Sequence, residues 1–79
     1  MSVSAYLFLG AEIDQVQNVA EAVRNLDGVD VVEVVTGPYD IIVRTSAPTM
    51  DELGQMVVSR VRQVPGIKAC LSSPVLTTL

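Results

Sequence analysis

The sequence predicts an α+β fold, with a four-stranded antiparallel sheet that carries two helices on one face. Four runs rich in β-branched and aromatic residues occur along the 79 residues. Between the first and second runs, and again between the third and fourth, apolar residues recur at the helical spacings of three and four. Gly and Pro separate these segments. A chain of this length corresponds to one small domain, which we assign to residues 1–79.

The first half of the chain predicts a strand, a helix and a second strand. Residues 3–9 are aliphatic and aromatic and form the first strand. The apolar face of the helix extends from Ile13 to Leu26, and Asp14 with Gln17 three residues later resembles a capping box. Gly28 ends this helix, because glycine tolerates the left-handed conformation that follows a helix.

The middle of the chain predicts a hairpin. The β-branched residues 29–36 form the second strand, and Ile41–Thr45 form the third. The turn between them, Thr36–Asp40, contains Gly and Pro, whose backbone preferences suit a tight turn. Two strands joined by so short a connection pair in antiparallel fashion.

A second helix and a fourth strand complete the prediction. Thr49 and Glu52 form a capping box, and the apolar stripe of this helix includes Met50 and Met56, which we expect in the core. Pro65-Gly66 ends the helix, and residues 67–76 form the last strand. The order β-α-β-β-α-β is that of a ferredoxin-like split βαβ sandwich.

The two halves of the chain repeat each other weakly. Leu26-Asp27-Gly28-Val29 corresponds to Val64-Pro65-Gly66-Ile67 at an offset of 38 residues. Val19 corresponds to Val57 at the same offset. The repeat supports a fold made of two βαβ halves joined by the hairpin, with both helices on one face of the sheet because such crossovers are right-handed.

Composition excludes several classes of function. Five Lys and Arg against nine Asp and Glu give a net charge of −4, so we expect no direct contact with nucleic acid. The chain has one Cys and no His, which argues against a disulfide framework, a zinc site and histidine catalysis. No apolar run approaches the ~20 residues of a membrane helix. We expect a cytoplasmic protein that has no cofactor or metal and is not an enzyme.

The apolar content is too high for a small domain with only one covered sheet face. Hydrophobic residues make up 49% of the chain. The first strand and both strands of the hairpin carry large apolar side chains on both faces. A solvated face would be polar at alternate positions. We therefore expect the uncovered faces of two copies to pack in a symmetric dimer. The residues that we place in this interface are Tyr6, Phe8, Val32, Val34 and Ile42.

Three segments resemble one known family. They are Leu26–Val29, Val34–Val43 and Val64–Lys68, and the most specific part is Thr36-Gly37-x-Tyr39-Asp40. Together they resemble the effector-binding RAM domain of the Lrp/AsnC regulators, whose pattern is "PGV…evtGxyDlvv…lpGVk" on the same βαββαβ frame. Those regulators also carry an N-terminal helix-turn-helix domain. Because the first strand here begins at Val3, we expect a stand-alone RAM module without DNA binding of its own.

The resemblance implies a function and a site. It implies sheet-to-sheet dimers that assemble into a higher oligomer, a small amino acid bound between dimers near the Gly-x-x-Asp turn, and full-length Lrp/AsnC homologues as further partners. Such a turn can offer N–H donors to a carboxylate and a side-chain carboxylate to an ammonium group. Alternatively, Asp40 only hydrogen-bonds its own turn. The expected ligand-binding residues are Thr36, Gly37, Pro38, Tyr39, Asp40, Ser72 and Ser73.

Two other functions fit the same fold class. One is a small cofactor-independent dimeric α+β-barrel enzyme, which would need a deep pocket with a His, a Trp or a reactive acid. The other is a purely structural assembly module, which shares the predicted dimer but responds to no ligand.

Overall fold

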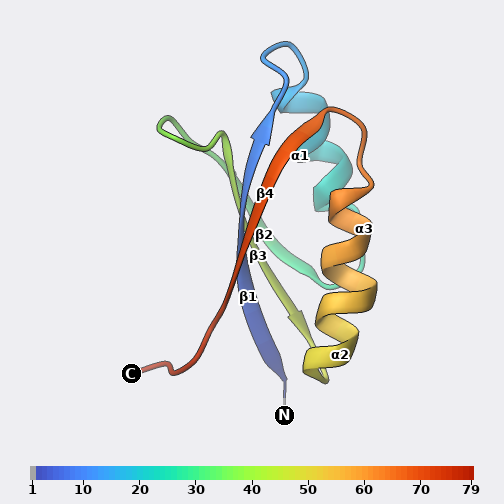
Figure 1. Cartoon of the computed structure of the whole chain (residues 1–79), viewed down its shortest axis with the longest axis vertical. Coiled ribbons are helices and arrows are strands. Elements are labelled where there is room, and N and C mark those ends of the chain that lie inside the picture. Colours follow the sequence, from blue (N-terminus) through green and yellow to red (C-terminus); the bar gives the residue numbers. More distant parts are fainter. Residues whose placement is uncertain (1) are drawn as a thin grey trace.

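The computed structural model describes residues 2–79, apart from the side chain of Met56. Its elements follow the predicted order: β1 (Val3–Ala11), α1 (Val16–Arg24), β2 (Val29–Val34), β3 (Ile41–Ala47), a second helix, and β4 (Ile67–Pro74). The second helix runs without a break through α2 (Met50–Glu52), the π-helical stretch η1 (Leu53–Val58) and α3 (Ser59–Arg62). Both helices lie on the same side of the sheet (Figure 1), which confirms the ferredoxin-like α+β fold.

The sheet has the strand order β2-β3-β1-β4, and neighbouring strands are antiparallel. Strands β1 and β3 are central, so that Leu7 of β1 pairs with Val43 on one side and with Ser72 on the other. Strands β1 and β2 are not neighbours, because β3 lies between them. Helix α1 therefore crosses over the sheet, as a split βαβ unit requires.

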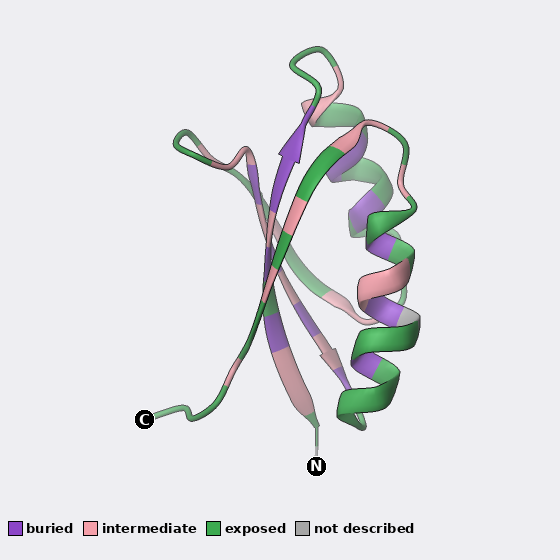
Figure 2. Ribbon diagram, viewed as in Figure 1, coloured by how far each residue is buried: buried purple, intermediate pink, exposed green. Residues whose placement is uncertain are grey.

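The core lies between the sheet and the helices. Alternate residues of β1, such as Leu7 and Leu9, are buried there, because successive side chains of a strand point to opposite faces. Figure 2 shows this alternation as buried segments on the strands and on the inner sides of the helices. Thr45 is the buried polar residue of this layer, and its hydroxyl donates a hydrogen bond to the Ala5 carbonyl at 3.0 Å.

A glycine follows each helix, four residues after its last residue, and packs against the other helix. Gly28 and Gly66 have φ values of +87° and +97°, which favour glycine over residues with a Cβ atom. A Cβ atom on Gly28 would lie 2.5 Å from Cγ2 of Val57, and one on Gly66 would lie 2.9 Å from Cγ2 of Val19. The corresponding residues of the sequence repeat therefore make corresponding contacts: the glycine of each half packs against the helix of the other half.

The start of the first helix differs from the prediction. Helix α1 begins at Val16, its N-cap residue is Gln15, and no side chain caps it. Asp14 therefore does not form the expected capping box, and Ile13 is 93% exposed instead of joining the apolar face. The cause is the longer β1, which continues past Gly10 to Ala11 and leaves the next residues to form a turn.

The second helix begins as predicted. The Glu52 N–H donates to Oγ1 of Thr49 at 3.2 Å, which is the main bond of the expected capping box. Met50 is half exposed and does not belong to the core, so that prediction is wrong. The expected core role of Met56 lies outside the described side chains. No helix within residues 2–79 has the length and apolar character needed to cross a membrane.

Candidate functional site

The sheet face opposite the helices is uncovered (Figure 1), and we call it the open face. The strand register places two rows of side chains across it, because directly paired residues share a face. One row is Glu33, Ile42, Phe8 and Leu71, and the other is Val31, Arg44, Tyr6 and Ser73, each given in the order β2-β3-β1-β4. The first row is apolar except at the β2 edge, and the second mixes apolar and polar groups.

Two residues predicted for the interface lie on the other face. Val32 and Val34 pair with Val43 and Ile41 of β3, whose side chains are buried beneath the helices. Tyr6, Phe8 and Ile42 share the open face as expected, but the prediction that Val32 and Val34 accompany them is wrong. The reason is the pairing with β3, which includes a register shift between Val29 and Val31. This pairing turns Val31, Glu33 and Val35 to the open face instead.

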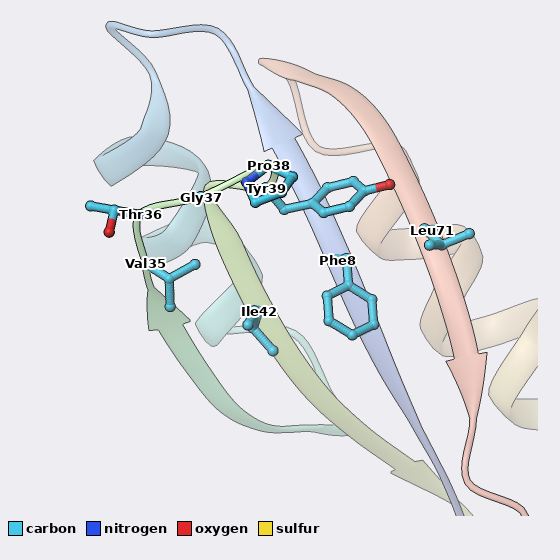
Figure 3. A pocket seen from close by; sticks show the side chains of 8 residues that line it. All are labelled: Phe8, Val35, Thr36, Gly37, Pro38, Tyr39, Ile42 and Leu71. Atoms are coloured by element: carbon cyan, nitrogen blue, oxygen red, sulfur yellow. The ribbon is translucent and has the colours of Figure 1, made fainter.

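A hollow of about 490 Å³ lies on the open face beside the β2–β3 turn. Figure 3 shows Phe8, Ile42 and Leu71 side by side on three neighbouring strands, with the Tyr39 ring reaching from the turn across β1. The rings of Phe8 and Tyr39 are 5.8 Å apart between centroids and inclined by 50°, a favourable tilted arrangement. The residues that line the hollow are Phe8, Val35, Thr36, Gly37, Pro38, Tyr39, Ile42 and Leu71.

The turn beside the hollow is anchored by Asp40. The Asp40 carboxylate accepts a hydrogen bond from the Ala11 N–H at 3.0 Å, and the Asp40 N–H donates to the Leu9 carbonyl at 2.9 Å. The Val35 N–H donates to the Asp40 carbonyl at 2.9 Å. The Asp40 carboxylate therefore joins the turn to the end of β1, instead of accepting from an amide of its own turn.

This anchoring role predicts a difference between two substitutions of Asp40. We expect Asp40→Ala to lower the free energy of unfolding by about 1–3 kcal/mol, because the partly buried Ala11 N–H loses its acceptor. Asp40→Asn keeps an acceptor oxygen and should lose less. Urea denaturation of the three proteins measures both changes. Equal stability of wild type and Asp40→Ala would contradict the anchoring role.

The structure brings together only part of the predicted ligand site. Thr36, Gly37, Pro38 and Tyr39 line the hollow, and Asp40 stands behind the turn. Ser73 is on the open face opposite Tyr6, whereas Ser72 pairs with Leu7 and points to the helix side. The two serines thus lie on opposite faces, and neither lines the hollow. Leu71, which does line it, was missed, although its position two residues before Ser73 places both on one face.

The polar end of the open face is built around Arg44. Its Nη1 donates to the Tyr6 hydroxyl at 2.7 Å, and its Cζ lies 5.2 Å from the centroid of the Tyr6 ring. Such a cation–π contact holds the guanidinium over the sheet. Within residues 2–79, no group of three or more Cys, Asp or Glu side chains could hold a metal ion. The hollow offers an apolar surface, the Thr36 and Tyr39 hydroxyls and turn backbone, which suits binding more than proton transfer.

These features define a small α+β domain with an uncovered apolar sheet face and a hollow beside a conformationally restricted turn. Residues 4–79 match the family model of the Lrp/AsnC ligand binding domain, and the chain belongs to this family of ligand-binding domains. An uncharacterized HTH-type transcriptional regulator of Pyrococcus abyssi is 29% identical over 75 residues, which cover 95% of this chain. The chain spans about half of that relative's length (47%).

Solved structures share the fold. A protein from Thermus thermophilus superimposes with a TM-score of 0.89 at 23% identity, covering 98% of this chain and 96% of the other. A transcriptional regulator from Neisseria meningitidis, solved as a complex with L-Met, superimposes with a TM-score of 0.81 at 21% identity. That match covers 95% of this chain and 50% of the regulator. The family is one of regulatory ligand-binding domains rather than of enzymes.

Proposed function

We propose that this chain is an amino-acid-sensing module of the Lrp/AsnC family, which dimerises through its open face and binds a small amino acid near the β2–β3 turn. The observation that carries the proposal is the hollow bordered by Thr36–Tyr39. The L-Met complex of the Neisseria meningitidis neighbour supports it, because the two share a fold and a family-type turn can meet both charged groups of an amino acid.

The residues that line the hollow offer separate regions for the side chain and for the charged groups of an amino-acid ligand. Phe8, Ile42 and Leu71 offer apolar contact to the side chain of the ligand. Its ammonium and carboxylate would remain at the turn, where Thr36 and the backbone supply polar partners. No Asp, Glu, Lys or Arg is among the lining residues, so a second copy would have to provide any charged contact. This requirement fits a site at a contact between copies.

Dimerisation through the open face would solve the problem of exposed apolar surface. Val31 and Leu71 are about half exposed, and Tyr6 is more than a third exposed. Contiguous apolar patches of this kind mark interaction sites, and a twofold dimer covers the same patch on both copies. The same face would allow full-length Lrp/AsnC regulators to co-assemble with this chain. Such a role places it in the cytoplasm, with DNA contacts left to the partner.

Thermal unfolding in the presence of each of the twenty amino acids tests the sensing function. A ligand at 100 times its Kd should stabilise the folded protein by about 2.7 kcal/mol and raise Tm accordingly. We expect at least one amino acid with an apolar side chain to do so. Isothermal titration calorimetry then checks the binding directly. If no amino acid shifts Tm and none produces heat, the sensing function is wrong.

A further inference from the structure

Arg44 is a cation on the open face of a central strand. It is half buried already in the single copy, and Ile42 and Ser46 are the next residues of β3 on the same face. Its guanidinium is turned towards β1, where it contacts the ring and the hydroxyl of Tyr6. Since β2 lies on the other side of β3, Arg44 is turned away from the edge strand β2.

Glu33 is an anion on the same face. It lies on the edge strand β2 directly opposite Ile42, so it stands at the end of the apolar row that includes Phe8 and Leu71. The Glu33 side chain is exposed. The other acidic residue nearby, Asp30, sits at the register shift of β2 rather than in the regular ladder. The carboxylate of Asp40 is directed to the Ala11 N–H.

Closing the open face against a second copy would remove both charges from water. A buried guanidinium without a counter-charge is strongly destabilising, whereas a paired one is tolerated. In a twofold interface every group occurs twice and each contact is reciprocal. A second cation, Lys68, lies at the β4 edge of the face, where its Cγ is 3.9 Å from the position of a Cβ atom on Gly10. Arg44 is the cation of the two central strands, so one Arg44 and one Glu33 on each face suffice for two equivalent ion pairs when the orientation of the two sheets brings them together.

We propose that Glu33 of one copy pairs with Arg44 of a second copy, and that this reciprocal pair sets the register in which the two open faces pack. The inference rests on the dimer of the proposed function and adds the contact that specifies it. The apolar row provides attraction without direction, since hydrophobic burial is non-directional. The charges penalise orientations that leave them buried and unpaired, which is how an interface excludes wrong arrangements.

Charge reversal with rescue tests the pair. Sedimentation equilibrium should show a dimer for the wild type, and Glu33→Arg or Arg44→Glu should each raise its dissociation constant by roughly 30-fold or more. The double variant Glu33→Arg/Arg44→Glu should return to within about threefold of the wild type, because the exchanged charges pair again. Asp30→Arg, a matched reversal on the same strand, should stay close to the wild type. Circular dichroism checks that each variant is folded.

The outcomes separate the pair from the dimer on which it rests. A monomeric wild type would overturn both. A dimeric wild type whose single variants dimerise equally well, or whose double variant is not rescued, would overturn the pair and leave the dimer in place. If Asp30→Arg is the disruptive change and is the one rescued by Arg44→Glu, the assignment to Glu33 is wrong.

Discussion

Replacing Gly28 or Gly66 with alanine should lower the free energy of unfolding by about 2–4 kcal/mol. Both glycines have left-handed φ values, +87° and +97°, which disfavour any residue with a Cβ atom. The added methyl group would also meet Cγ2 of Val57 or Val19 at 2.5 Å and 2.9 Å, respectively. Strain and overpacking therefore act together at each position. Urea denaturation, followed by circular dichroism, measures the loss.

Gly54→Ala is the matched control for these substitutions. Gly54 lies in the second helix, where a Cβ atom would find no neighbouring atom within 4 Å. Alanine is more favourable than glycine inside a helix by about 0.8–1.0 kcal/mol. We therefore expect Gly54→Ala to raise the free energy of unfolding, whereas the same substitution at Gly28 or Gly66 lowers it. A Gly28→Ala protein as stable as the wild type would contradict the close packing of the turn against the second helix.

Local signals explain why the element order could be predicted from the sequence. Three signals determine the conformation of residues close to them in the sequence: the β-branched run of β2, the capping box at Thr49 and the glycines after each helix. The start of α1 depends instead on a distant strand. Pairing with β4 extends β1 through Gly10 to Ala11, and the residues up to Gln15 then form the turn that enters the helix. The apolar spacing at Ile13 carried no information about that pairing.

The part of the candidate site that lies in one short sequence motif could be predicted. The part that depends on how the strands pair could not. Thr36–Tyr39 form one short motif, and the structure places them around the hollow. The strand β2 carries valines on both faces, so its sequence cannot show which set faces the helices. Only the register with β3 decides this, and it sends Val32 and Val34 to the helix side. The bond from Ala11 to Asp40 likewise joins segments 29 residues apart.

Phe8→Asp should separate the proposed dimer into folded monomers. Phe8 lies on a central strand of the open face, between Ile42 and Leu71, and aromatic residues at the centre of an interface contribute most of its affinity. Each copy would then bury one carboxylate in the interface without a partner. We expect the dimer dissociation constant to rise by roughly a hundredfold or more. Light scattering measures the mass, and circular dichroism shows whether the monomer remains folded.

Val31→Asp and Val34→Asp form a matched pair that tests which face is the interface. The two valines belong to the same strand and are similarly exposed, at 47% and 52%, but they point to opposite sides of the sheet. Val31→Asp should weaken the dimer, because it removes apolar surface from the open face and offers Arg44, its direct partner on β3, a carboxylate of the same copy in place of Glu33 of the second copy. Val34→Asp should leave the dissociation constant unchanged, because this valine lies on the helix side. If Val34→Asp weakens the dimer and Val31→Asp does not, the copies associate through the helix side of the β2 edge and not through the open face.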